Sequence, residues 1–219
     1  MRIRKYGHSC LLLEERGEAL LFDPGRSEFL DPLATPDAFA GVSVIAITHW
    51  HPDHADPELI RRIAEASGAT VLAPPEGEQE LRKAGVELTV AKPGELSLGA
   101  FRLQLTDAPH APILGAAVPR NLAYLVNDRL LNVGDSFDPV LESYRGVAML
   151  VLPIAAPWLT ELDAAAFAGR VAPSRVLPVH DGYVKDFFRS RRYDTYRREL
   201  EKRSVRFEGD VGTETAVEV

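Results

Sequence analysis

Short apolar runs, broken by glycine, proline and charged residues, fill the first half of the chain and predict strands more often than helices. The run at 42–48 is continuously apolar and is typical of a strand buried on both faces. The turn residues Gly7, Gly17 and Asp23-Pro24-Gly25 separate the earlier runs. The strands predicted in this half cover residues 3–6, 9–13, 19–22, 42–48, 70–73, 87–91, 95–98 and 101–106.

Helix starts and stops are marked at a few positions. Asp56-Pro57-Glu58 combines an N-cap residue, a proline in the first turn and an early acid, and Gly68 provides the stop. Thr160 with Asp163 three residues later is a variant of the capping box and predicts another helix start. We further expect helices at 76–84 and near 189–203, and strands at 122–126, 130–133, 148–152, 175–179 and 205–207.

The order of elements is strands followed by a few helices, twice over, around a seam near residue 110. Such an order predicts an α/β (α+β) fold in which two mixed sheets pack together with helices outside. No linker or repeat interrupts residues 1–219, so we expect a single domain.

Composition excludes several classes of protein. The 219 residues are 46% hydrophobic and 26% charged, as in an ordinary globular protein, and the net charge of −7 does not favour nucleic acid or anionic lipid as a partner. One cysteine cannot form an internal disulfide. Only three leucines, 11–13, follow the basic N-terminus before two acids, so we expect no signal peptide, no membrane segment and a cytoplasmic location.

The strongest chemical signal is the segment Thr48-His49-Trp50-His51-Pro52-Asp53-His54, between a buried strand and a predicted helix. Imidazole and carboxylate are the usual ligands of zinc, and functional side chains gather on loops at strand ends. Four donors exceed what one open catalytic ion requires, so two ions fit better. The alternative is a histidine-rich loop that is exposed to solvent and binds no metal.

This segment resembles the H-x-H-x-D-H signature of the metallo-β-lactamase-fold hydrolases, and Asp107-Ala-Pro-His110, Asn132-Val-Gly-Asp135 and Pro178-Val-His180 continue the match in order. The resemblance implies a four-layer αββα sandwich and a dinuclear centre. It also implies that His49, His51 and His110 bind one metal, that Asp53, His54 and His180 bind the second, and that Asp135 bridges both.

Gly7-His8-Ser9-Cys10 and Phe22-Asp23-Pro24 are similar to the openings of the bacterial subgroup related to ascorbate-phosphate lactonases. In that subgroup the early histidine and aspartate lie near the metals. The likeness implies that His8 contacts substrate and that Asp23 orients a metal-bound imidazole. The alternatives are a surface turn at His8 and a turn former at Asp23.

The mechanism implied is hydrolysis by a metal-bound hydroxide of a small ester, lactone or phosphoester, with Asp53 steering the nucleophile and returning a proton to the leaving group. Zinc is the default ion, and manganese and iron accept the same donors. Cys10 lies on a predicted strand before three leucines, so we expect a buried structural thiol.

Residues 185–206 carry nine basic and four acidic side chains with interleaved aromatics. This segment could grip a phosphorylated substrate or nucleic acid, or be a helix with a solvated cationic face. Two other functions therefore stay open, a phosphodiesterase or nuclease and a non-catalytic metal-binding sensor. A homo-oligomer also stays open.

Overall fold

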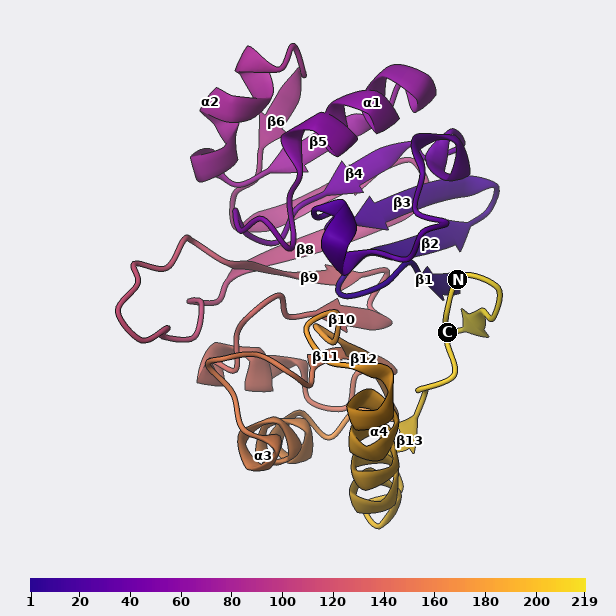
Figure 1. The fold of residues 1–219 in the computed structure, drawn as a ribbon, viewed down its shortest axis with the longest axis vertical. Helices are drawn as coiled ribbons and strands as arrows, with labels where there is room; N and C mark the ends of the chain where they lie inside the picture. The colour runs from indigo at the N-terminus through magenta and orange to yellow at the C-terminus, as the bar shows by residue number, and fades with distance from the viewer.

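The computed structural model describes all residues, 1–219, and arranges them in four layers, helix–sheet–sheet–helix (Figure 1). Two seven-stranded mixed sheets pack face to face. Helices α1 and α2 cover the outer face of the first sheet, and α3 and α4 cover the outer face of the second (Figure 1). The expected αββα sandwich of two mixed sheets is confirmed, because each sheet buries one face on the other and its second face under helices.

The first sheet has the order β14-β1-β2-β3-β4-β5-β6. Its pairs are antiparallel from β14 to β3 and parallel from β3 to β6. Its strands are β1 (Arg2–Lys5), β2 (Leu11–Glu15), β3 (Glu18–Phe22), β4 (Val44–Ala46), β5 (Thr70–Ala73), β6 (Leu88–Val90) and β14 (Val217–Glu218).

The second sheet has the order β13-β12-β11-β10-β9-β8-β7 and repeats the plan, antiparallel from β7 to β10 and parallel from β10 to β13. Asn127 and Asp128 both have positive φ, at 50° and 54°, as the tight turn between β9 and β10 requires. The strands are β7 (Gly94–Leu98), β8 (Phe101–Asp107), β9 (Leu122–Val126), β10 (Leu130–Asn132), β11 (Met149–Pro153), β12 (Arg175–Val179) and β13 (Arg206–Phe207).

Two helices begin where the predicted caps place them. The Asp56 side chain accepts from the backbone N–H groups of Glu58 and Leu59, and Gly68 ends that helix at φ 71°. Thr160 and Asp163 form the capping box. The helices are α1 (Pro57–Ser67), α2 (Pro75–Lys83), α3 (Glu161–Val171) and α4 (Asp186–Glu201), with short 3₁₀ helices η1 (Ser27–Phe29), η2 (Pro36–Phe39) and η3 (Pro139–Tyr144).

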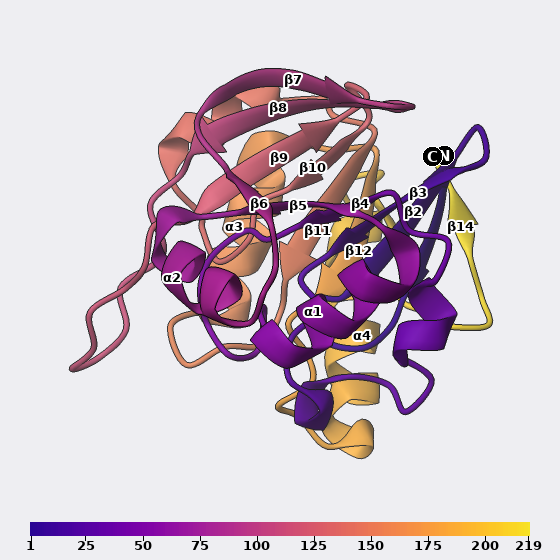
Figure 2. The same cartoon turned by 90° about the horizontal axis from the view of Figure 1, so that it is seen from above.

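Two expectations were wrong, and one strand was missed. The first sheet gives way to the second between β6 and β7, before Gly94, because β7 and β8 pair with β9 rather than with β6; the seam is not near residue 110. Helix α4 begins at Asp186, one turn earlier than expected. The C-terminal strand β14 was not predicted, since a two-residue strand exists only through its pairing with β1. That pairing puts Val219 beside Met1, so the two termini are adjacent (Figure 2).

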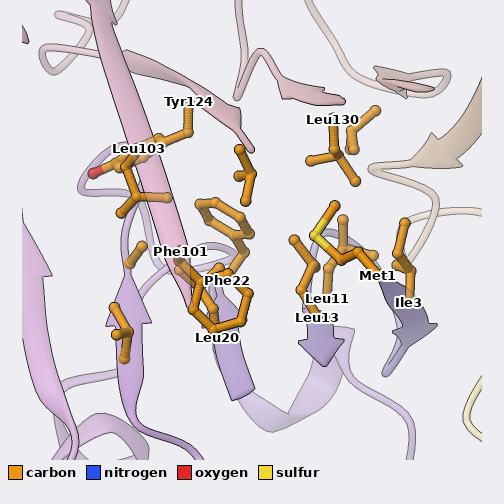
Figure 3. Packing of buried hydrophobic residues seen from close by; sticks show 14 of the residues in the cluster. Met1, Ile3, Leu11, Leu13, Leu20, Phe22, Phe101, Leu103, Tyr124 and Leu130 are labelled. Carbon is orange, nitrogen blue, oxygen red and sulfur yellow. The ribbon is translucent and has the colours of Figure 1, made fainter. Parts of the chain in front are cut away.

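Three apolar clusters fill the spaces between the four layers. The largest lies between the sheets and includes Phe22, Phe101 and Tyr124, all fully buried (Figure 3). The rings of Phe22 and Tyr124, from opposite sheets, meet edge to face with centroids 5.3 Å apart. The other two clusters lie under α1 and α2 and under α3 and α4. No helix combines the length and the apolar composition needed to span a bilayer.

The same core ties the end of β4 to the second sheet. The Tyr124 hydroxyl donates to the Ile47 carbonyl at 3.1 Å, and the Leu122 N–H donates to the Thr48 carbonyl at 2.9 Å. Both acceptors immediately precede His49. The loop 48–54 therefore starts at a point that both sheets hold.

We predict that Phe22→Ala lowers the free energy of unfolding by about 3–5 kcal/mol, because it opens a cavity between the two sheets. Urea denaturation measures this. Leu162, 82% exposed on α3, provides the matched control, and Leu162→Ala should change stability by less than about 0.5 kcal/mol. Equal losses in the two variants would contradict the packing described.

Candidate metal centre

Four loops from the two sheets bring histidine and aspartate side chains to one place. The loop 48–54 follows β4, His110 follows β8, Asp135 follows β10 and His180 follows β12. Gly25 permits the close packing of this region, since a Cβ at Gly25 would stand 2.1 Å from the Asp53 carbonyl oxygen. All the side chains expected as metal ligands are buried except His51, which is partly buried.

The potential ligand atoms form three overlapping groups, and within each group the atoms lie within 4.8 Å of one another. The first is His49, His51 and His110, the second is His49, His54 and Asp135, and the third is His8, Asp53, His54 and His180. Every residue expected as a ligand falls in one of these groups. His8, expected to face substrate, lies in the third.

Four imidazoles turn the same ring nitrogen toward the centre. The Nε2 atoms of four histidines are buried and have no hydrogen-bond partner in the protein. Burying an acceptor without a partner is unfavourable, and such atoms call for an explanation. The four are His49, His54, His110 and His180.

The opposite nitrogen, Nδ1, is occupied in each of the four. Nδ1 of His110 donates to the Ala111 carbonyl and Nδ1 of His180 to the Ala155 carbonyl, both at 2.6 Å. Nδ1 of His54 donates to Oδ2 of Asp23 at 2.9 Å. Since these acceptors require N–H on Nδ1, the lone pair of a neutral ring is on Nε2, the form in which histidine binds a metal.

Asp23 holds two of the rings at once. Besides His54, it accepts from the Thr48 N–H and the Thr48 hydroxyl, both at 2.8 Å. Because the Thr48 hydroxyl donates its hydrogen bond to Asp23, its oxygen is free to accept one from Nδ1 of His49, at 3.0 Å. Burial raises the pKa of Asp23, and His54 acts in the opposite direction. Imidazole nitrogens held in place in this way, together with carboxylate oxygens, form a donor set that fits divalent ions such as zinc.

His8 has the opposite tautomer. Its Nδ1 accepts from the Gly182 N–H at 3.0 Å, so in a neutral ring Nε2 carries the hydrogen and donates to Oδ2 of Asp53 at 3.1 Å. Burial, with His180 nearby, lowers the pKa of His8 to about 4, so the ring is neutral at pH 7. Its geometry suits a residue that orients Asp53 rather than a metal ligand.

Three of the eight non-glycine residues with positive φ lie at the same place. His8, Asp23 and His180 all have positive φ, at 43°, 47° and 62°. Non-glycine residues adopt this region at a cost of about 1–3 kcal/mol each, and such residues cluster at functional sites.

The charges are strongly coupled. Burial alone would raise the pKa of Asp135, but His180 and His54 outweigh it and hold that pKa well below its usual range. Burial lowers the pKa of His180, but Asp135 outweighs burial and raises it to about 10. A cation among these groups would displace such protons, so metal binding should weaken as the pH falls.

A family model described as the beta-lactamase superfamily domain matches residues 2–180, which include every residue expected at the centre. The chain belongs to this superfamily.

Relatives and solved structures agree. Protein Rv0786c of Mycobacterium tuberculosis is 33% identical to the chain over 192 residues, which cover 84% of this chain and 85% of that protein. A UPF0173 metal-dependent hydrolase of Pyrobaculum arsenaticum is 29% identical over 198 residues, covering 82% and 84%. The metallo-beta-lactamase fold protein YhfI of Bacillus subtilis has a TM-score of 0.75 at 14% identity, covering 100% and 99%, a likeness of fold.

Sequence reasoning missed several residues that surround the centre of this superfamily member. Trp158 Nε1 donates to Oδ2 of Asp135 at 3.0 Å, and the Tyr183 hydroxyl donates to Oδ2 of Asp53 at 2.6 Å. Asn121 accepts from the Asp135 N–H at 3.0 Å and donates to the Ala108 and Val133 carbonyls. Tyr183 is only three residues past His180, which was the one available signal.

Behind the centre, a buried ion pair supports the turn after His180. Lys5 Nζ donates to Oδ2 of Asp181 at 2.7 Å and to the Pro178 carbonyl at 3.0 Å, and the Tyr193 hydroxyl also donates to Asp181. Burial raises the pKa of Asp181, but Lys5 outweighs it, so the pKa is lowered and the carboxylate stays charged.

The basic segment 185–206 is mostly engaged within the protein. Tyr193 and Tyr196 pack against Phe207 rather than facing solvent. Six of its nine basic side chains have an acidic or carbonyl partner, namely Arg189, Arg192, Arg197, Lys202, Arg203 and Arg206. Cys10 is buried, and burial raises the pKa of its thiol, as expected of a structural cysteine.

We predict that Asp23→Ala lowers the affinity for zinc about 10- to 100-fold, because His54 and Thr48 lose their shared acceptor. Competition with a chromogenic chelator measures this on protein whose fold is checked by circular dichroism. Asp37→Ala, which removes an exposed acid, should leave the affinity unchanged.

We predict that Asp181→Asn lowers the free energy of unfolding by about 3 kcal/mol, since Lys5 stays buried without its counter-charge. The double variant Lys5→Met, Asp181→Asn should lose less stability than Asp181→Asn alone. Denaturant unfolding of the three variants tests this, and a larger loss in the double variant would refute the assignment.

Proposed function

We propose that this metal-dependent hydrolase of the beta-lactamase superfamily binds two divalent ions, zinc by default, within a single domain of residues 1–219. Its substrate is a small molecule with an ester, lactone or phosphoester bond. His49, His51 and His110 hold one ion, Asp53, His54 and His180 hold the other, and Asp135 lies between them.

One observation carries this proposal: four buried Nε2 atoms without partners, from loops of both sheets, around Asp135. Nε2 of His180 and His110 lie 3.0 and 3.5 Å from Oδ2 of Asp135, and Nε2 of His54 lies 3.5 Å from its Oδ1. A carboxylate with a different histidine near each oxygen is well placed to bridge two cations.

Two ions in this centre would make a nucleophilic water available at neutral pH and stabilise the oxygen that gains negative charge. The protein contributes orientation. Asp23 and the backbone carbonyls fix the rings, Trp158 and Asn121 fix Asp135, and His8 fixes Asp53. Asp53, within 3.1 Å of His8 and 2.6 Å of Tyr183, is the carboxylate best placed to steer the nucleophile and to hold a proton for the leaving group.

A small substrate is favoured over nucleic acid because most cations of α4 already have partners and Tyr196, which is buried, cannot stack on bases. The narrower likeness to ascorbate-phosphate lactonases, and with it a phosphorylated substrate, stays a prediction.

We predict that Asp53→Ala lowers kcat/KM on generic lactone and phosphodiester substrates by about 100-fold or more, because a ligand matters at least as much as the residues that support it. Zinc-loaded protein is assayed with metal content measured in parallel, and Asp37→Ala serves as the control.

If the unaltered protein holds its full metal content but turns over no substrate, the alternative function, a non-catalytic metal-binding sensor, is indicated instead. Hydrolysis of short single-stranded nucleic acids, with binding that weakens steeply as salt is added, would indicate the alternative function of a phosphodiesterase or nuclease.

A further inference from the structure

Two hydrogen-bond donors, Tyr183 and His8, and the proposed metal ion all approach one oxygen of Asp53. Its Oδ2 accepts from the Tyr183 hydroxyl at 2.6 Å and from His8 Nε2 at 3.1 Å. The same oxygen faces Nε2 of His180 at 3.4 Å and Nε2 of His54 at 3.9 Å, the two imidazole nitrogens that would share an ion with it. A carboxylate oxygen has two lone pairs in its plane, and His8 and Tyr183 take both, so a cation bound at this oxygen would replace one of the two donors.

The His8 bond is the one that cannot be given up. The ring is 1% exposed, and its Nδ1 is held by the Gly182 N–H. A Cβ at Gly182 would stand 3.0 Å from that nitrogen, so the turn 181–183 closes tightly over His8. His8 therefore keeps its hydrogen on Nε2, pointed at Asp53.

The Tyr183 bond is free to change. The side chain is 52% exposed, so its outer side leaves room for the small shift that takes the hydroxyl off Oδ2 and turns its hydrogen elsewhere. The ring is held edge-on by His8 and Phe29, with each centroid 5.1 Å away, and it lies 5.4 Å from the ring of His180. Its hydroxyl is therefore a positioned donor at the open side of the centre.

We propose that Tyr183 is a catalytic hydrogen-bond donor, whose hydroxyl leaves Asp53 when the ion held by Asp53, His54 and His180 is bound and then donates to the substrate oxygen that gains negative charge. The class of the substrate rests on the function proposed above. The move of the Tyr183 hydroxyl away from Asp53 when the ion binds, which we call the exchange at Asp53, does not depend on that function. A neutral phenol suits the role because it can donate to an oxyanion without adding a positive charge beside two cations.

The alternative is that Tyr183 only braces Asp53, and the two roles predict opposite signs for metal binding. A brace lost in Tyr183→Phe would weaken zinc binding about 10- to 100-fold, as loss of a supporting residue does. If the Tyr183 hydroxyl instead competes with the ion for Oδ2, Tyr183→Phe leaves the zinc dissociation constants unchanged or lowers them. His8→Ala, by contrast, should weaken binding of the second ion in either case.

The first test is zinc titration of Tyr183→Phe, His8→Ala and the unaltered protein by competition with a chelator. The matched control is Tyr196→Phe, which removes a buried hydroxyl that has no partner on the core side of α4. We expect two ions with unchanged or tighter binding in Tyr183→Phe. Weaker binding of either ion in this variant overturns the exchange at Asp53.

The second test uses inorganic phosphate as an inert probe of the zinc-loaded protein, by isothermal titration calorimetry. We expect the phosphate dissociation constant to rise about 10-fold or more in Tyr183→Phe and not in Tyr196→Phe, because a hydrogen bond to a charged group is lost. On any substrate that is turned over, kcat should fall about 100-fold in Tyr183→Phe with full metal content.

An unchanged phosphate constant in Tyr183→Phe overturns the catalytic assignment. If the unaltered protein turned over no substrate, the proposed function would fail, while the zinc and phosphate measurements would still decide the role of Tyr183.

Discussion

Buried imidazole nitrogens that converge on one place without a hydrogen-bond partner in the protein are the constraint on which this structure depends. Each unsatisfied buried acceptor costs about 1–3 kcal/mol, and four converge here beside two carboxylates. The arrangement is reasonable only for a protein that places cations among them. The Nδ1 partners of these rings, Asp23, Thr48 and two backbone carbonyls, hold the Nε2 atoms in place and fix the tautomer in which a neutral ring has its lone pair on Nε2.

The double-sheet architecture supplies the rigidity that such an arrangement needs. Each sheet has an antiparallel half and a parallel half, and the ligand loops follow strands of both. The loop of the first sheet is tied to the second through Tyr124 and Leu122, which bond the two residues just before His49. Motion of one sheet against the other would therefore disturb the centre directly. The strained backbone at His8, Asp23 and His180 is tolerated because packed elements on several sides hold it.

The C-terminal third of the chain contributes more to the centre than the candidate ligand His180. The segment 180–183 provides His180, the N–H that sets the tautomer of His8, and the hydroxyl of Tyr183, while Lys5 anchors Asp181 from the first strand. Helix α4 seals this anchor with Tyr193. From the sequence, its cationic face could contact a phosphorylated substrate, nucleic acid or solvent; in the structure, several of its cations form ion pairs within the protein.

The amino-acid sequence by itself determined the local features, because each depends on neighbours a few residues away. The caps at Asp56 and Thr160, the stop at Gly68 and the cluster at 49–54 could all be read in this way. The resemblance to a known family then added His110, Asp135 and His180 to the candidate ligands. Only the tertiary structure decided the position of the seam, the pairing of β14 with β1, the tautomers of the histidines, and the approach of Trp158, Asn121 and Tyr183 to the carboxylates. These depend on contacts between residues tens or hundreds of positions apart, as in the pairs His8–Asp53 and Tyr183–Asp53, and no local pattern encodes which atoms of distant loops will meet.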